Sequence, residues 1–132
     1  MISSKSFIVT GAVYGVLGVV LGAMASHALK SVLPENLMLS FNTGVRYQMY
    51  HALALLAIAP SLPYIRKTLV NWIYYLLTLG TLLFSGSIYA LSLGPLVEMS
   101  TKALGPVTPI GGLLLITGWF SLALAAIMGN KD

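Results

Sequence analysis

Residues 44–51, with the sequence GVRYQMYH, place the polar side chains best suited to chemistry at the start of a long apolar segment. Tyr47 and His51 are four residues apart, so a helix places them on one face, and Arg46 and Tyr50 share a neighbouring face. The guanidinium can bind an anion, and the imidazole can act as an acid or base or ligate a haem iron. In apolar surroundings such groups are costly, so the cluster indicates either a functional site or a buried hydrogen-bond network.

The composition indicates that a bilayer surrounds these groups. The 132 residues are 58% hydrophobic and 8% charged, whereas soluble domains carry about 25% charged residues. The chain has no cysteine, which excludes disulfides and thiolate metal sites. Its net charge of +4 is scattered, and no basic run favours binding of nucleic acid. We therefore predict one membrane domain over residues 1–132, with the lipid bilayer as partner, no cofactor and no nucleic-acid partner.

Four segments are long and apolar enough to cross a bilayer, which takes about 20 residues. They are residues 7–29, 45–62, 69–93 and 110–128, all bounds being approximate. Pro34 favours the start of a short interfacial helix, and residues 42–44 (Asn-Thr-Gly) offer cap and turn chemistry before the second span. Thr108 and Pro109 favour a cap and first turn for the fourth span. The predicted fold is an all-α, four-transmembrane-helix bundle with a short interfacial helix between spans one and two.

An even number of spans places both termini on one side of the membrane. That side carries Lys5, Arg66, Lys67 and Lys131, and the other side carries Lys30, Arg46 and Lys102. The positive-inside rule then predicts cytoplasmic termini in the cell (inner) membrane, by four basic residues against three.

On this topology a polar cluster gathers toward the non-cytoplasmic half. The candidate residues are His27, Arg46, Tyr47, Tyr50, His51, Ser85, Tyr89 and Glu98. Arg46 falls in the first turn of the second span, where a cation opposes the helix dipole, so Glu98, Glu35 or a lipid phosphate should compensate it. Ser85 and Tyr89 belong to a hydroxyl stripe that either bonds its own helix backbone or forms a polar wall. A purely structural interpretation is a network that holds spans one, two and three together.

Glycines form a stripe along the first span. Gly11, Gly15, Gly18 and Gly22 recur at intervals of three and four residues. Small side chains let helices approach closely in lipid, where hydrophobicity gives no drive for association. Packing within the bundle is the favoured interpretation, and a seam between copies of the chain is the alternative. Trp119, near the middle of the fourth span, is expected to be a packing residue.

Four stretches resemble, in this order, the successive motifs of the Domain of Unknown Function 423 family. They are GAVYGVLGVVLGAMASHALK, FNTGVRYQMYHALALL, SGSIYALSL and LGPVTPIGGLLLITGW. The resemblance covers nearly the whole chain, and Ser26 departs from it where glycine or alanine would be typical. It implies a four-helix integral membrane protein and no established enzymatic activity, cofactor or substrate.

Three functions are compatible with these features. The favoured one is a structural or accessory protein that interacts with a larger membrane-protein partner or forms a homo-oligomer. The alternative is binding or transport of a small lipophilic or anionic molecule at a pocket of Arg46, Tyr47, His51 and His27. A haem or quinone redox site is a third, which the different depths expected for the two histidines disfavour. Since no nucleophile–base pair or metal motif is present, we predict no catalytic residue, no metal site and no enzyme.

Overall fold

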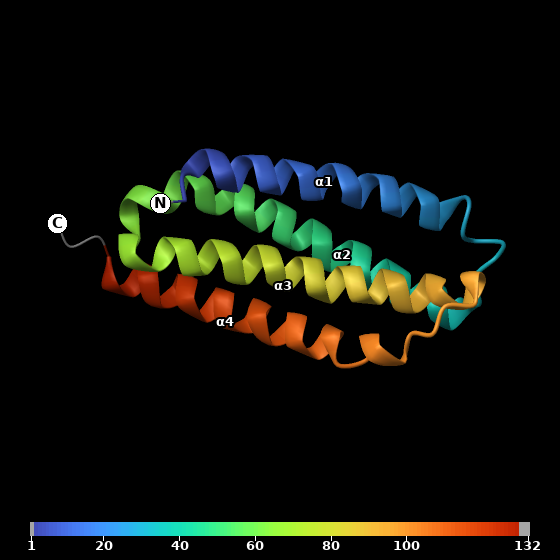
Figure 1. The fold of residues 1–132 in the computed structure, drawn as a ribbon. Coiled ribbons are helices and arrows are strands. Elements are labelled where there is room, and N and C mark those ends of the chain that lie inside the picture. Colours follow the sequence, from blue (N-terminus) through green and yellow to red (C-terminus); the bar gives the residue numbers. More distant parts are fainter. Residues whose placement is uncertain (1, 130–132) are drawn as a thin grey trace.

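The computed structural model describes residues 2–129 as four long α-helices joined by turns and 3₁₀ helices (Figure 1). The α-helices are α1 (Ser4–Ser26), α2 (Glu35–Ile58), α3 (Lys67–Leu93) and α4 (Val107–Met128), and the 3₁₀ helices are η1 (Ala59–Tyr64), η2 (Gly94–Val97) and η3 (Lys102–Leu104). The prediction of an all-helical protein with four main helices is confirmed.

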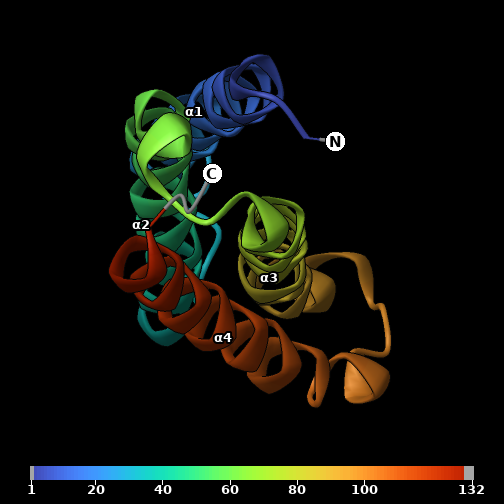
Figure 2. The same cartoon turned by 90° about the vertical axis from the view of Figure 1, so that its left-hand side faces the viewer.

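The helices pack in chain order, with α1 on α2, α2 on α3 and α3 on α4. Seen along the helix axes in Figure 2, α2 and α3 form the centre, and α1 and α4 lie at opposite ends of the array. The outer helices accordingly leave a larger share of their length exposed than α3 does. The arrangement is therefore more open than a closed bundle, in which the first and last helices would also pack together.

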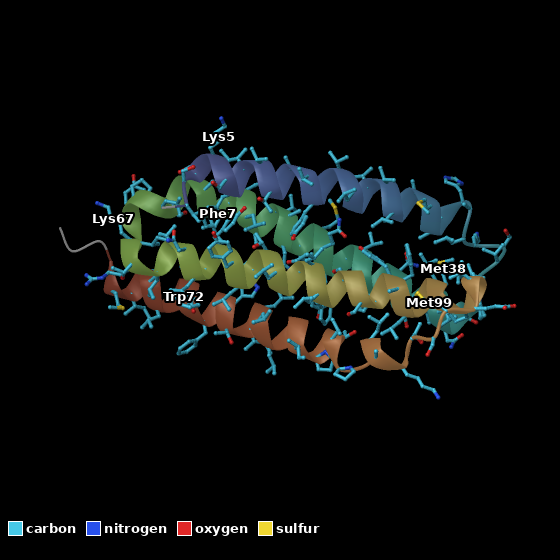
Figure 3. All side chains as sticks on the ribbon, viewed as in Figure 1. Lys5, Phe7, Met38, Lys67, Trp72 and Met99 are labelled. Carbon is cyan, nitrogen blue, oxygen red and sulfur yellow. The ribbon has the colours of Figure 1, made fainter. Side chains whose placement is uncertain are left out.

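The two ends of the array differ in what they contain. The start of α1, the 3₁₀ helix η1 and the end of α4 lie at one end, and η2 and η3 lie at the other (Figure 1). Figure 3 shows Lys5 and Lys67 at the first end and Met38 and Met99 at the second. We call these the η1 end and the η2 end.

Among the described residues, three helices are long and apolar enough to cross a membrane: α1, α3 continued by η2, and α4 continued by η3. Helix α2 has a comparable length, but Arg46, Gln48 and His51 interrupt its apolar sequence. The amide and the imidazole are both buried against neighbouring helices. Helix α2 can therefore cross the membrane only as part of the packed array, because polar side chains need partners there.

The expected separate interfacial helix is not present as such, because α2 begins at Glu35 and continues without a break to Ile58. The Asn-Thr-Gly sequence at 42–44 lies inside this helix. Thr43 bonds back to the carbonyl of Leu39, and Gly44 is buried against Tyr89 of α3. These residues therefore serve helix packing where the sequence favoured a cap and turn.

Two other boundaries differ from expectation. Helix α1 covers residues 4–26 where 7–29 was expected, so His27 follows the helix as its C-cap. Helix α4 begins at Val107 after an N-cap at Pro106, so the expected cap at Thr108 is wrong. The Thr108 hydroxyl instead bonds to Ser87 Oγ of α3 at 2.6 Å, which ties the two helices together.

Two apolar clusters flank a polar layer. The cluster toward the η1 end includes Phe7, Leu55, Ile58, Ile73 and Leu77, and the cluster toward the η2 end comprises Ala25, Leu29, Leu33 and Phe41. The buried polar residues of α2 lie between Phe41 and Leu55 in the helix. The polar residues of α2 therefore lie between an apolar cluster toward each end of the array.

Candidate functional site: a polar layer between two crevices

The buried face of α2 determines which polar residues enter the protein. Its buried positions recur at intervals of three and four residues and are Phe41, Gly44, Gln48, His51, Leu55 and Ile58, with Ala52 beside them. Gln48 and His51 share this face with the apolar core. Tyr47 and Tyr50 are 41% and 57% exposed, and Arg46 is also exposed. The structure therefore separates residues that the sequence grouped together.

His51 is the centre of one set of contacts. Trp119 Nε1–H of α4 donates to His51 Nε2 at 3.1 Å, so that nitrogen carries no proton. The other nitrogen, Nδ1, lies 2.7 Å from the backbone oxygen of Tyr47 and donates its proton there. Both nitrogens of a neutral ring are thus engaged within the protein. This arrangement leaves no lone pair for a haem iron.

A crevice lies between α2 and α4, and a residue of α3 also contributes to its lining. Its volume is about 280 Å³, and its lining consists of Tyr47, His51, Phe84, Gly112, Leu115, Ile116 and Trp119. The rings of Tyr47 and Phe84 lie 4.8 Å apart, and those of His51 and Trp119 lie 6.0 Å apart. The surface of this α2/α4 crevice is therefore mainly aromatic and aliphatic.

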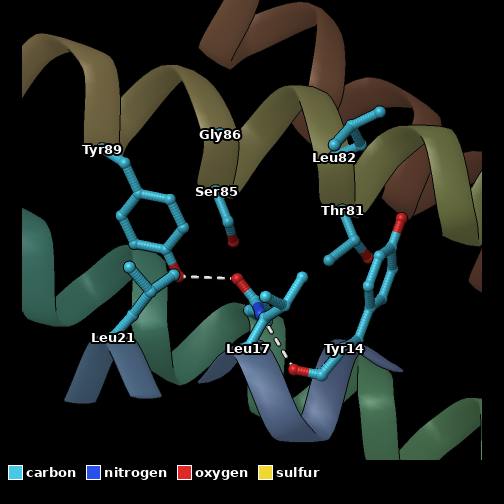
Figure 4. Close-up of a pocket in the computed structure, with 9 residues that line it drawn as sticks. Tyr14, Leu17, Leu21, Thr81, Leu82, Ser85, Gly86 and Tyr89 are labelled. Atoms are coloured by element: carbon cyan, nitrogen blue, oxygen red, sulfur yellow. Dashed lines mark hydrogen bonds between the residues drawn. The ribbon is translucent and has the colours of Figure 1, made fainter. Parts of the chain in front are cut away.

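Gln48 links three helices. Its Nε2 donates to the backbone oxygen of Tyr14 on α1 at 2.8 Å, and its Oε1 accepts from the Tyr89 hydroxyl of α3 at 2.8 Å (Figure 4). The Tyr14 hydroxyl in turn donates to the carbonyl of Thr78 on α3 at 2.8 Å. We call Tyr14, Gln48 and Tyr89 the central network. It bridges α1 and α3, which are not in close backbone contact.

A second crevice lies between α1 and α3 and has a volume of about 180 Å³. The three residues of the central network belong to its lining. Gln48, Thr81 and Ser85 are buried at its base, whereas Leu17 and Leu82 at its rim are about half exposed. Figure 4 shows this α1/α3 crevice with Thr81 and Ser85 on successive turns of α3. The lining thus combines a polar base with an apolar rim that faces outward.

The hydroxyl protons at the base of the α1/α3 crevice are all directed to the protein. Ser85 donates to the carbonyl of Gly44 at 2.8 Å, and Thr81 donates to the carbonyl of Leu77 at 2.7 Å. The Tyr14 hydroxyl donates to the Thr78 carbonyl, and the Tyr89 hydroxyl donates to Gln48 Oε1. The base therefore offers oxygen lone pairs and one remaining Gln48 N–H. No charged residue belongs to its lining.

Arg46 lies outside both crevices, near the middle of α2 rather than in its first turn. Within the described chain, its guanidinium donates to Thr43 Oγ1 at 3.1 Å instead of to a carboxylate. The neighbouring residue Val45 packs near Gly22 of α1. At a rise of 1.5 Å per residue, Gly22 lies about 10 Å along the helix from the middle of α1, so Arg46 lies at about the same level. An exposed arginine at this level reaches the boundary of an about 30 Å hydrocarbon core by extending its side chain.

His27 and Glu98 also lie apart from the polar layer. His27 is exposed just after α1, and Glu98 is exposed after η2 with a left-handed φ of 52°. Among the described residues, no group of three or more His, Cys, Asp or Glu side chains could hold a metal ion. Of the predicted cluster, the structure brings Tyr47 and His51 together in one crevice and Ser85 and Tyr89 together in the other.

The glycines of α1 have unequal surroundings. A Cβ at Gly11 would lie 2.9 Å from the Ala52 carbonyl oxygen, and one at Gly18 would lie 2.5 Å from Met49 Sδ. At Gly22 a Cβ would make an ordinary contact, and at Gly15 it would meet nothing within 4 Å. Gly11 and Gly18 thus lie against α2, and Gly15 lies on an open part of the helix surface.

Sequence reasoning did not identify several residues that organise the site. Gln48 lies within GVRYQMYH but is not among the predicted site residues, Tyr14 was not predicted either, and Trp119 was expected to be a packing residue. The glycines of the α3–α4 contact were also missed, namely Gly80, Gly111 and Gly118. The spacing of Gln48 relative to Phe41 and Leu55 was the one available signal, because it places the amide on the buried face.

Long apolar helices around an internally bonded polar layer define a helical integral membrane protein. A family model described as "Protein of unknown function (DUF423)" matches residues 21–112. The chain is also 40% identical over 121 residues to the UPF0382 membrane protein of Staphylococcus haemolyticus, which covers 92% of this chain and 94% of the relative. The chain belongs to this DUF423 family, as its motifs suggested.

Relatives extend from bacteria to a yeast. The UPF0382 membrane protein YwdK of Bacillus subtilis is 37% identical over 127 residues, covering 93% of this chain and 97% of the relative. The UPF0382 membrane protein of Schizosaccharomyces pombe is 42% identical over 112 residues, covering 84% of this chain and 92% of the relative. No solved structure matches the chain.

Proposed function

We propose that this membrane protein binds an uncharged lipophilic molecule that carries a hydrogen-bond donor, in the α1/α3 crevice. The observation that supports the proposal is the base of this crevice, where Gln48, Thr81 and Ser85 offer lone pairs at the middle of an apolar array. A long-chain alcohol has the required chemistry, with a hydroxyl for the base and an alkyl chain for the rim.

The lining also argues against an anionic ligand. Arg46 and His27 lie outside the crevice, and its lining contains no cation. A carboxylate placed there would lose its hydration without gaining a positive partner, which is costly in an apolar environment. The ligand class is therefore narrowed from lipophilic or anionic to lipophilic and uncharged.

The test uses hexadecanol and hexadecanoate as matched probes and native mass spectrometry of the protein in a zwitterionic detergent at pH 8. We expect hexadecanol to be retained in preference to hexadecanoate. Gly86→Leu should abolish retention, because Gly86 lines the crevice and a Cβ there meets nothing within 4 Å, so the larger side chain fills free space. Gly15→Leu is the matched control, since Gly15 also has open space but lies outside this crevice.

Retention of both probes by both variants would place the alcohol in the detergent belt and contradict the proposal. A wild-type protein that retains neither probe would instead favour the second candidate, an accessory or structural role beside a larger membrane protein or in a homo-oligomer. That role is supported by the central network itself, in which Gln48 is satisfied at both ends without a ligand. Co-purification of a stoichiometric partner from native membranes would then be the next measurement.

We also propose that the η1 end faces the cytoplasm in the inner (cell) membrane. Lys5, Arg66 and Lys67 lie at or beside this end, and Lys30, Arg46 and Lys102 lie toward the η2 end. Lys131, which the sequence prediction also counted, lies outside the described residues. Because the chain has no cysteine, Ser3→Cys and Thr101→Cys give single labelling sites. A membrane-impermeant maleimide applied to whole cells should label Thr101→Cys alone, and labelling of Ser3→Cys alone would reverse the orientation.

A further inference from the structure

A third cavity lies at the η2 end, where the start of α2, the end of α3 and the start of α4 meet. Its volume is about 390 Å³, and its lining consists of Leu37, Ser40, Ile88, Leu91, Ser92, Gly105, Thr108 and Pro109. Ser40, Gly105 and Pro109 are exposed, whereas Ile88 and Ser92 are buried. This end cavity therefore opens outward and has Ser92 at its base.

Ser92 is unusual among the buried hydroxyls. It is 1% exposed, and its Oγ has no hydrogen-bond partner within the described chain. A buried hydroxyl without a partner loses hydration and gains nothing in return, so such groups are rare. The Ser92 hydroxyl therefore carries a proton that no group of the described chain accepts, beside the cavity that Ser92 lines.

The other hydroxyls of the lining have already used their protons. Ser40 donates to the carbonyl of Asn36 at 3.1 Å. Thr108 contacts Ser87, whose one hydroxyl proton is already donated to the carbonyl of Phe84 at 3.0 Å. Because each hydroxyl has a single proton, Thr108 must be the donor in its contact with Ser87. Ser92 is therefore the side chain in this lining that is set to donate.

The depth of Ser92 identifies the kind of acceptor. Ser92 is twelve residues beyond Gly80, the middle residue of α3, which corresponds to about 18 Å along the helix. The hydrocarbon core extends about 15 Å from the bilayer centre, so this level is where lipid headgroups begin. Lipid ester carbonyls lie at this boundary and accept hydrogen bonds, and the aliphatic lining suits the adjoining acyl chain. No charged residue belongs to the lining, which favours a neutral acceptor over a phosphate.

We propose that the end cavity binds the glycerol-ester region of a membrane lipid, with the Ser92 hydroxyl donating to an ester carbonyl oxygen. The proposal concerns a cavity separate from the α1/α3 crevice and is independent of the alcohol-binding proposal.

The test compares a diester and a diether phosphatidylcholine with the same oleyl-length chains. The two lipids share the phosphate and choline, but the diether lipid has no ester carbonyl. The protein is reconstituted in nanodiscs with equal amounts of both lipids and released for native mass spectrometry. We expect the wild type to retain the diester lipid about fivefold over the diether lipid, the ratio for one hydrogen bond of about 1 kcal/mol.

Ser92→Ala should reduce this ratio to about one, because the donor is removed while the shape of the cavity is kept. Ser26→Ala is the control, since Ser26 is an exposed hydroxyl bonded within α1 and outside the cavity. Ser92→Ala should leave thermal unfolding in detergent unchanged or shift it upward, which separates lost recognition from misfolding. Equal retention of both lipids by the wild type, or an unchanged ratio in Ser92→Ala, would overturn the proposal and leave a water molecule as the partner of Ser92.

Discussion

Alanine substitutions at Gly11 and Gly15 should have opposite effects on stability, although the two positions are one helical turn apart on α1. A Cβ at Gly11 would meet the Ala52 carbonyl oxygen at 2.9 Å and the side chain of Leu56 at 3.0 Å. A Cβ at Gly15 would meet nothing within 4 Å. Gly11→Ala therefore pushes α1 away from α2, whereas Gly15→Ala adds a methyl group at an open surface.

The magnitudes follow from the geometry of the contact. The Gly11 Cβ must shift by about 0.5 Å to reach an ordinary contact, and the obstacle is a backbone atom that cannot rotate away. Overpacking of this kind costs about 1–3 kcal/mol. In a helix interior, alanine is more favourable than glycine by about 1 kcal/mol of stability. This gain offsets part of the overpacking cost at Gly11, and at Gly15 it is the only expected effect. We expect Gly11→Ala to lose up to about 2 kcal/mol and Gly15→Ala to gain up to about 1 kcal/mol.

The free energy of unfolding can be measured by titration with sodium dodecyl sulfate in mixed micelles, followed by circular dichroism. The oligomeric mass of each variant is measured in the same detergent by light scattering. If Gly15→Ala destabilises the protein as much as Gly11→Ala, or converts an oligomer to a monomer, the reasoning from internal packing is refuted. The glycine stripe would then continue into a seam between copies of the chain.

Four further substitutions, in three experiments, test the contacts between helices by the same titration. Trp119→Phe keeps an aromatic ring but removes the donor to His51 Nε2, so it should cost about 1–2 kcal/mol, and no loss would mean that another donor replaces the indole. Gln48→Leu and Tyr89→Phe should be coupled by about 0.6–1.7 kcal/mol in a double-mutant cycle, and additive effects would contradict their hydrogen bond. Gly111→Ala should cost about 3 kcal/mol or more, because a Cβ there meets the backbone of α3, and a tolerated alanine would disprove this close approach.

The sequence predicted most of the helices because lipid imposes a simple rule. Every backbone polar group in the hydrocarbon region must be bonded within its own helix, so a long apolar segment has essentially one conformation. Helices α1, α3 and α4 accordingly begin within three residues of the predicted spans. Helix α2 was the exception, since the helix that Pro34 favours was expected to end before residues 42–44 but continues through them to Ile58. Gly44 looked like a turn residue, and its role is to make room for Tyr89.

The candidate site was predicted in part. The apolar positions Phe41 and Leu55 define a face of α2, and intervals of three and four residues place Gln48 and His51 on it. The same spacing puts Arg46 off this face, so the grouping of neighbouring polar residues was too coarse. The partners of Gln48 and His51 could not be predicted, because one sequence does not determine how neighbouring helices are rotated against α2.

The polar layer gives the array a specific register that apolar packing in lipid would not supply. Aliphatic side chains gain little by exchanging lipid for protein neighbours, so sliding α2 past α1 would cost little from apolar contacts alone. A slide of one turn would, however, separate Gln48 from the Tyr14 carbonyl and from the Tyr89 hydroxyl, and would separate His51 from Trp119. Each group would then lie without a partner in the hydrocarbon region. The Tyr14 hydroxyl adds a further bond, from α1 to the Thr78 carbonyl of α3, so Tyr14 joins the two helices beside the α1/α3 crevice that it lines.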